Sequence, residues 1–377
     1  MPVKCGNVCT HAMLGGSEQG QRDRQQQQGS QARRPGAAQE GLLLLAVALT
    51  LLAATEHGVR AHVAALDRHG GAVRNLGSAA EPSSRLYGYM VRVTGTPQVV
   101  ELPLDADFGV QADTPVLIRH VAMFQWHEIH VGYPLYEQDW VNHAVNSATF
   151  SDPRGHANPG PLPIPPRRFI APRVRLDGFL LDPAIVDAIP GSVPLTPDFG
   201  RLPPNLAATF HVVADALVSS ADPQAPRLGD LRIRWREVPL QPISVFARAE
   251  GDRLLPAQSA AAGSGFVVQL GDRSLADLLP DVPDAPAWPW TRRLLALLLA
   301  VVALRLLIAL WPRLHRDPLF VVAAALAPLT ALAGIEWLRL RTGLGVGLLL
   351  LAVAAAVLAG WRVRHHATTP DVHDSGD

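Results

Sequence analysis

Four histidines and one glutamate are the side chains of this sequence whose types and spacing could support metal or acid–base chemistry. They are His127, Glu128, His130, His143 and His156. The helical zinc motif H-E-x-x-H sets its two histidines one turn apart, but His127 and His130 are closer together and lie in a predicted strand, where they face opposite sides. Glu128 and His130 share a face, so a site needs His143 or His156 to join them through the fold. Solvated or hydrogen-bonded structural residues are the simpler interpretation.

Other signatures of enzymes are missing from the sequence. We find no G-x-S-x-G nucleophile turn, no phosphate-binding loop and no dinucleotide fingerprint. Cys5 and Cys9 form a C-x-x-x-C pair with only His11 nearby, which supplies too few ligands for a zinc site. We therefore predict a protein that is not an enzyme and has no catalytic residue, metal or cofactor. A membrane-anchored, metal-dependent hydrolase that uses the histidine cluster is kept as an alternative.

The charges of the chain argue against a nucleic-acid partner. The sequence has 33 basic and 33 acidic side chains among 377 residues, spread along its length. No basic surface of the kind that binds phosphate backbones is indicated. The central part of the chain is also long enough to bury a core of its own.

The elements that must position these residues are divided by hydrophobicity. Apolar runs predict four transmembrane helices, one N-terminal and three C-terminal, at 41–56, 291–312, 318–336 and 343–361. Tryptophans at or near the helix ends fit interfacial anchors: Trp290, Trp311, Trp337 and Trp361. The first run ends early, at Glu56 and His57, so it is either a retained helix, which we prefer, or the apolar core of a secretion signal. This division leaves a disordered tail at 1–40, a domain at 57–290 and a C-terminal tail at 362–377.

Arginines in the short loops favour a cytoplasmic location for both termini, which makes the domain at 57–290 extracytoplasmic. Those in favour are Arg33, Arg34, Arg313, Arg316, Arg362 and Arg364, and those against are Arg292, Arg293, Arg339 and Arg341. Arg305 lies inside a predicted helix but near enough to its end to reach the headgroups. The glycines of 343–347 favour close helix packing or oligomerisation. Because the helices show no acidic relay, a transporter is only a second alternative.

Strand patterns dominate the domain between the first two helices. We predict strands at 87–93, 99–104, 116–131, 208–218, 231–235, 243–249 and 266–270. Residues 151–172 hold seven prolines and two glycines, which indicates an ordered loop or a linker. Short helices are predicted at 179–189 and at 274–279, the second capped by Ser274 and Asp277. The predicted fold class is a multi-pass membrane protein with a large β-rich α+β domain, divided into two small barrel-like units.

A series of motifs resembles the transmembrane protein 43 family, also called LUMA. It begins with Met123-Phe124-Gln125-Trp126-His127-Glu128 and continues, in the family's order, with Tyr136 to Trp140, Asn146-Ser147, Phe150, Gly155-His156-Ala157-Asn158-Pro159, Gly229-Asp230-Leu231-Arg232, Val245-Phe246-Ala247-Arg248, Gly251-Asp252-Arg253-Leu254-Leu255-Pro256 and Gly271-Asp272. The likeness covers about residues 41–361, including the one-plus-three helix layout. It implies a non-enzymatic protein which in animals lies in the endoplasmic reticulum and inner nuclear membrane. There it organises nuclear-envelope complexes with lamins and emerin.

The proline-rich stretch at 159–172 and the bias toward Ala, Arg and Pro are typical of a bacterial relative. For such a member we expect an inner-membrane scaffold that organises protein complexes or responds to membrane stress, with its large domain extracytoplasmic. The expected partners are the lipid bilayer and other membrane proteins, or a second copy in a homo-oligomer, with no nucleic acid.

The resemblance also supplies candidate binding residues. They are Gln125, Trp126, Glu128, Gly155, His156, Asn158 and Pro159. A structural interpretation competes with binding: Gly155 and Pro159 shape a turn, Asn158 bonds its own backbone, and Trp126 fills the core.

Overall fold

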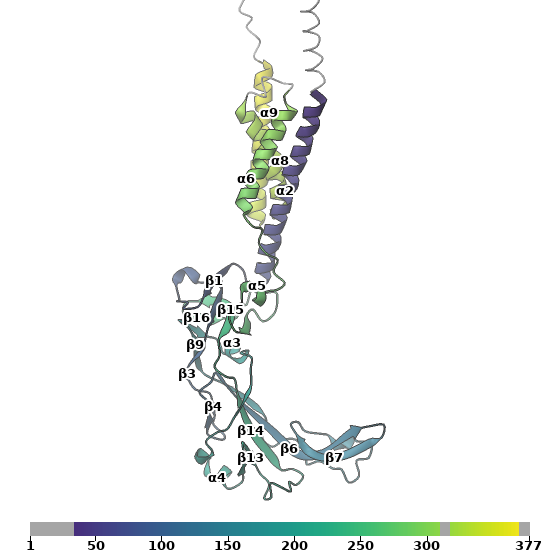
Figure 1. Ribbon diagram of the computed structural model, residues 1–377, viewed down its shortest axis with the longest axis vertical. Helices are drawn as coiled ribbons and strands as arrows, with labels where there is room; N and C mark the ends of the chain where they lie inside the picture. The colour runs from purple at the N-terminus through teal and green to yellow at the C-terminus, as the bar shows by residue number, and fades with distance from the viewer. Residues whose placement is uncertain (1–33, 310–316, 369–377) are drawn as a thin grey trace, which may run out of the picture. The chain divides into compact units, whose positions relative to one another are not determined.

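The structure, a computed structural model, describes residues 34–309 and 317–368 (Figure 1). Within them the chain forms two compact units, one made of the residues up to Ala64 and from Pro283 onward, the other of Ala65–Val282. The predictions for Cys5, Cys9, Trp311 and the loop arginines Arg33, Arg313 and Arg316 lie outside the described residues.

The first unit is a bundle of helices. Its members are α2 (Arg34–Arg68), which runs on past the unit's boundary, α6 (Pro289–Leu307), α8 (Pro318–Trp337) and α9 (Thr342–Thr368). Three stretches of the described residues are long and apolar enough to cross a membrane: Ala38–Arg68, Pro318–Trp337 and Thr342–His365. The predicted fourth span is not confirmed, because α6 carries Arg292, Arg293 and Arg305 within its 19 residues.

The first helix is longer at both ends than the predicted span at 41–56. It begins at Arg34, inside the segment predicted to be a disordered tail, and continues through Glu56 and His57 to Arg68. Glu56 does not end the helix because its carboxylate is paired: Arg293 Nε and Nη2 donate to it at 2.6 and 3.0 Å. A charge that is paired and hydrogen-bonded is tolerated where an isolated one is not.

α2 and α6 lie side by side and antiparallel. Added to Gly41, near one end of α2, a Cβ atom would lie 2.9 Å from Leu307 Cγ, and at Gly58 it would lie 2.7 Å from Pro286 Cγ, just before α6 begins. Between these points the two helices share an apolar cluster with α8, formed by Ala48, Leu52, Ala296, Ala300, Ala325 and Leu329. Small residues therefore let α6 follow α2 along most of its own length.

Glycines also bring α8 and α9 together. A Cβ atom on Gly345 would lie 2.5 Å from Leu338 Cα, and one on Gly334 would lie 2.8 Å from Leu349 Cγ. A Cβ atom added to Gly343 or Gly347 would have no neighbouring atom within 4 Å. Of the predicted glycine cluster, Gly345 is thus the member that makes the close packing.

The second unit contains two large sheets, and the first has eight strands. Its path is β1 (Val73–Gly77), β2 (Met90–Gly95), β15 (Ile243–Glu250), β16 (Arg253–Leu255), β10 (Phe179–Leu181), β9 (Arg173–Leu176) and β3 (Gln98–Glu101), with β17 (Val267–Leu270) on β15. The pairs β1–β2 and β10–β16 are parallel. Val91, Val93, Val245 and Ala247, from the central pair β2–β15, are fully buried in its core.

The second sheet has seven strands. Its path is β12 (His211–Val213), β13 (Ala216–Val218), β14 (Leu231–Glu237), β6 (Val116–His130) and β7 (Pro134–Val141), with β11 (Val193–Leu195) on β14 and β8 (Arg167–Ile170) on β6. A separate ribbon pairs β4 (Leu104–Asp105) with β5 (Val110–Gln111). Along β6 the odd-numbered residues from Leu117 to Gln125 are all buried, as the period of two in a strand requires.

Short helices connect these strands. They are α3 (Pro183–Asp187), α4 (Pro204–Ala207), α5 (Leu275–Leu278) and the 3₁₀ turns η1 (Ser84–Leu86), η2 (Ser147–Thr149) and η3 (Phe199–Arg201). The capping box of Ser274 and Asp277 is confirmed. The predicted helix at 179–189 is only partly present, because its first residues join the eight-stranded sheet as β10. The two barrel-like units are not confirmed. A closed barrel has no edge strands, whereas the path of one described sheet ends at β1 and β3 and that of the other at β12 and β7.

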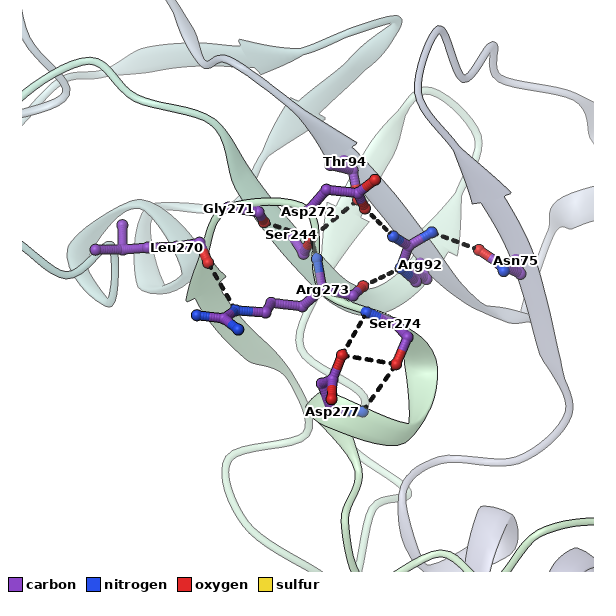
Figure 2. Close-up of polar contacts among 10 residues, drawn as sticks. All are labelled: Asn75, Arg92, Thr94, Ser244, Leu270, Gly271, Asp272, Arg273, Ser274 and Asp277. Atoms are coloured by element: carbon purple, nitrogen blue, oxygen red, sulfur yellow. Dashed lines mark hydrogen bonds and ion pairs between the residues drawn. The ribbon is translucent and has the colours of Figure 1, made fainter.

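The Gly271-Asp272 motif holds a turn against the eight-stranded sheet (Figure 2). The buried Ser244 hydroxyl donates to the carbonyl oxygen of Gly271 at 2.8 Å and accepts from the Arg273 N–H at 2.8 Å. Asp272 pairs with the largely buried Arg92, whose Nη1 donates to Asn75 Oδ1 at 2.8 Å. This motif is therefore structural: it joins β1, β2 and β15 to the segment that enters α5.

Candidate functional site

The candidate residues gather on the hairpin made by β6 and β7. In Figure 1 this hairpin continues beyond the rest of the seven-stranded sheet. Its register pairs Trp126 with Gln138 and Glu128 with Tyr136. The strand β14 leaves β6 near Met123, so the edge of β6 opposite β7 needs another partner from there on. Residues 142–160 form a loop that follows β7, and this loop, here called the hairpin loop, supplies that partner.

Asn158 takes the place of a strand at this edge. Its Oδ1 accepts from the Trp126 N–H at 2.7 Å, and its Nδ2 donates to the carbonyl oxygens of Trp126 at 2.9 Å and Val145 at 3.2 Å. The expectation that Asn158 bonds its own backbone is therefore wrong. One side-chain amide therefore provides hydrogen-bond partners for both the N–H and the carbonyl oxygen of Trp126. Backbone groups that are shielded from water need such partners.

Gln125 fastens the same loop from the other face of β6. Its side chain is fully buried, with 0% of its surface exposed. Nε2 donates to the carbonyl oxygen of His143 at 2.6 Å, and Oε1 accepts from the Val145 N–H at 3.1 Å. Both polar ends of the amide are hydrogen-bonded within the protein and the side chain is fully buried, so Gln125 is not accessible to an external ligand.

His156 completes an aromatic stack on the opposite face. Its ring lies 3.9 Å, centroid to centroid, from Tyr136 in a stacked arrangement and 4.8 Å from Trp126 edge to face. The Nδ1 atom lies 2.9 Å from the carbonyl oxygen of Asp152. Because a carbonyl can only accept, Nδ1 carries the proton in this arrangement. Trp126 thus packs against the loop rather than in either main core.

Glu128 holds the start of the same segment. Its carboxylate accepts from the Ser151 N–H at 3.1 and 3.2 Å and from the Tyr136 hydroxyl at 3.3 Å, while His130 Nε2 lies 3.6 Å away. Hydrogen bonds from Ser151, followed by the charge of His130 and the hydroxyl of Tyr136, lower the pKa of Glu128. The side chain is therefore an ionised acceptor rather than a general acid.

Gly155 and Pro159 shape the hairpin loop. Gly155 has φ of +82°, a conformation that favours glycine, with open space where a Cβ atom would stand. Pro159 packs on Gly229, whose Cβ position would be 3.4 Å from Pro159 Cγ. The fold thus brings Gln125, Trp126, Glu128, His156 and Asn158 together, and the two remaining candidates set the path of the loop.

The five residues of the metal alternative do not converge. His127 lies on the face of β6 opposite Glu128, and the exposed His143 ring has its Nδ1 atom 3.0 Å from Oδ1 of its neighbour Asn142. Among the described residues, no three His, Cys, Asp or Glu side chains are placed to hold a metal ion. The hydrolase alternative therefore has no support in this part of the chain.

The turn of the hairpin exposes apolar side chains. Val131 and Tyr133 are 66% and 69% exposed, and Leu135, the second residue of β7, is 41% exposed. These three residues are called the hairpin tip below. Sequence reasoning did not single them out, although an apolar and aromatic run at a predicted strand end was a usable signal.

Sequence reasoning also missed two buried ionic clusters. Arg119 Nη1 donates to Asp105 at 2.8 Å inside the domain, where Trp235 Nε1 also donates to Asp105, at 3.0 Å. Desolvation by burial raises the pKa of Asp105, against the lowering effects of Trp235 and Arg119. In the helix bundle, Glu56 accepts from Arg293 and, at 2.8 Å, from Trp337 Nε1. Neither pairing is visible in sequence, because the partners are far apart along the chain.

Among the described residues, this arrangement contains no nucleophile–base pair and no group of ligands for a metal, and the polar groups of Gln125, Glu128 and Asn158 are hydrogen-bonded within the protein. The described residues also contain three apolar helices of membrane length. These features define an integral membrane protein whose β-rich domain carries a hairpin fixed by side-chain hydrogen bonds. The sequence model of one protein family, Transmembrane protein 43, matches residues 130–359. The chain belongs to this family.

Similar proteins agree with that assignment. The chain is 24% identical to Transmembrane protein 43 of Pongo abelii over 318 residues, which is 73% of this chain and 77% of the relative. It is also 24% identical to Transmembrane protein 43 of Homo sapiens, over 51% of this chain and 53% of the relative. A Transmembrane protein 43 homolog of Drosophila melanogaster is 24% identical over 72% of this chain and 80% of its own length. None of these names describes an enzyme. No solved structure matches the chain significantly.

Proposed function

We propose that this protein is a non-enzymatic membrane scaffold whose hairpin tip binds another membrane protein. The observation that carries the proposal is the contrast between the two ends of the hairpin. At its base, Gln125, Asn158 and Glu128 fix the hairpin loop with hydrogen bonds. At its end, Val131 and Tyr133 are left in solvent. Exposed aromatic and aliphatic side chains on a rigid support are typical of protein-binding surfaces.

A protein of the same membrane is the partner that fits best. The helices confine the domain to the neighbourhood of one bilayer, which raises the effective concentration of other proteins anchored there. The strand β7 is also an edge strand of its sheet, so its outer backbone groups can pair with an extended segment of that partner. Organisation of protein complexes at a membrane follows from such binding.

The membrane and topology are part of the same proposal. We propose that α6 is the fourth span and that both termini lie in the cytoplasm, with the β-rich domain outside it. In a bacterium this places the domain beyond the inner membrane, where a role in membrane organisation or stress fits. In a eukaryotic cell the equivalent places are the endoplasmic reticulum and the inner nuclear membrane.

Quantitative co-purification from detergent-extracted membranes tests the scaffold. We expect Tyr133→Ser combined with Leu135→Ser to remove defined membrane proteins that remain with the wild type and with Val212→Ser. Val212 is a matched control, because it is exposed on β12 of the same sheet. The proposal is wrong if the tip variant and the control retain the same proteins, or if the wild type copurifies only with further copies of itself.

A further inference from the structure

The helix bundle contains a cavity that the scaffold function does not use. Its volume is about 580 Å³, within the range of about 300–1,000 Å³ that small-molecule sites occupy. All four helices line it, and most of its surface is apolar, with Leu52, Leu297, Leu329 and Leu348 among the lining residues. Every lining residue belongs to the bundle itself.

One end of the cavity is polar. Glu56, Arg293 and Trp337 line it and are joined by hydrogen bonds of 2.6 to 3.0 Å. Only 3% of the Glu56 side chain is exposed, against 26% for Arg293. Arg293 uses Nε and Nη2 for Glu56, and its guanidinium also lies 4.8 Å from the Trp290 ring centroid. Its Nη1 is left to bind an acceptor that enters from the rim.

The rim of the cavity faces outward from the helices. Leu294 and Leu344 line the cavity and are 61% and 50% exposed on the bundle surface. Because apolar surface on membrane-spanning helices contacts lipid, an acyl chain can enter from the side. A dedicated passage from water is not needed.

Charge at this end of the bundle selects the head group. The segments that meet here, 56–60, 284–293 and 336–341, contain five arginines and three acidic residues, Glu56, Asp284 and Glu336. Glu336 pairs with Arg60 at 3.1 Å, and Glu56 pairs with Arg293. The surplus is positive, which favours a phosphate without a balancing cation. Trp288 and Trp290, at the start of α6, are 78% and 73% exposed and fit headgroup depth.

We propose that this cavity binds one anionic phospholipid, with an acyl chain between α2, α6, α8 and α9 and its phosphate at Arg293. An acyl chain in this cavity contacts all four helices. The site is independent of the hairpin tip, so the proposal stands or falls separately from the scaffold function.

Photolabelling of the full-length protein in detergent tests the site. The probe is phosphatidylglycerol with a diazirine on its acyl chain, compared with phosphatidylcholine and a free fatty acid carrying the same chain. We expect phosphatidylglycerol to label peptides containing Leu329 or Leu348 several-fold more than either other probe. Unlabelled phosphatidylglycerol should compete on the wild-type protein, which requires no variant. Equal labelling by phosphatidylcholine indicates ordinary surrounding lipid and overturns the proposal, as does stronger labelling by the fatty acid.

Matched variants locate the lipid. Thr330 lines the cavity and Ala331 does not, so Thr330→Trp should reduce labelling several-fold while Ala331→Trp leaves it unchanged. Replacing both Glu56 and Arg293 with Gln keeps a neutral hydrogen-bonding pair, and we expect it to label equally with the two phospholipids. Thermal unfolding shows that each variant is folded. Unchanged labelling in a folded Thr330→Trp variant, or a retained anionic preference in the double variant, overturns the assignment.

Discussion

At the residue scale, two side-chain amides do what strands do elsewhere in a sheet. Asn158 bonds both backbone groups of Trp126, and Gln125 bonds the backbone of His143 and Val145. Each hydrogen bond provides a partner for a backbone N–H or carbonyl group beside the hairpin that no strand pairs with. The motif residues therefore support the hairpin, and the binding surface that we propose is made by their neighbours at the hairpin tip.

Removal of the Asn158 amide should loosen the hairpin loop. Asn158→Ala leaves backbone groups of Trp126 and Val145 without partners, at a cost of about 1–3 kcal/mol. We expect faster amide hydrogen exchange across residues 145–158 by mass spectrometry. Asn142→Ala is the control, because the Asn142 side chain contacts only the neighbouring His143 ring. Equal protection in the two variants would show that the amide does not hold the loop.

Acid should release the segment that Glu128 holds. The pKa of Glu128 is lowered in the folded protein, chiefly by hydrogen bonds from Ser151. The ionised carboxylate therefore contributes its full stabilisation above the ordinary glutamate pKa of about 4.3, and this stabilisation is lost as the pH falls through the lower folded pKa. The Ser151 amide resonance, followed by NMR between pH 6 and 3, should report this change. Glu128→Gln should abolish the transition. Glu137→Gln, on the partner strand, should keep it; the same flat profile in both variants contradicts the assignment.

The residues of the site were predictable and their contacts were not. The sequence pointed to Gln125, Trp126, His156 and Asn158, and the period of two along β6 placed Glu128 and His130 on one face. Which backbone groups Asn158 bonds depends on where β14 stops, and no local pattern encodes that. Glu56 was interpreted as a helix end because its partner Arg293 follows more than two hundred residues later.

At the element scale, the helices approach one another closely at glycines, and a hydropathy pattern does not show which glycines make these contacts. α8 and α9 approach at Gly334 and Gly345, and α2 approaches α6 at Gly41. Apolar length predicted where α8 and α9 lie, but it could not predict the extension of α2 to Arg68, which depends on tertiary pairing of its charges. The predicted strands include the long β6 and β15, whereas β10 was predicted as the start of a helix because it is short and lies in an apolar run. Further strands that were not predicted include β1, β7, β8, β9, β11 and β16.

Substitution of one glycine should separate α8 from α9. A leucine at Gly345 would place its Cβ 2.5 Å from the Leu338 backbone, so the helices must move apart. We expect Gly345→Leu to destabilise the protein by about 1–3 kcal/mol, the usual cost of overpacking. Gly347→Leu is the matched control, since its Cβ meets open space. Thermal unfolding in detergent measures both, and equal midpoints would contradict the packing described.

At the scale of the whole molecule, the path of α6 decides the topology. α6 runs antiparallel to α2 over most of its own length, which supports our proposal that α6 is a fourth span. We expect tags at the two termini to be protected or exposed together when sealed membrane vesicles are treated with protease. Opposite accessibility would show that only three helices cross.

We propose that the hairpin tip contacts another membrane protein, and cross-linking inside the living cell tests this contact without extraction or purification. A photoreactive phenylalanine analogue placed at Tyr133 and, as control, at Val212 would be activated by light before extraction. We predict a discrete adduct from position 133, identified by mass spectrometry as a membrane protein other than this chain, and none from position 212. Adducts with this chain alone, or the same adducts from both positions, would contradict the account.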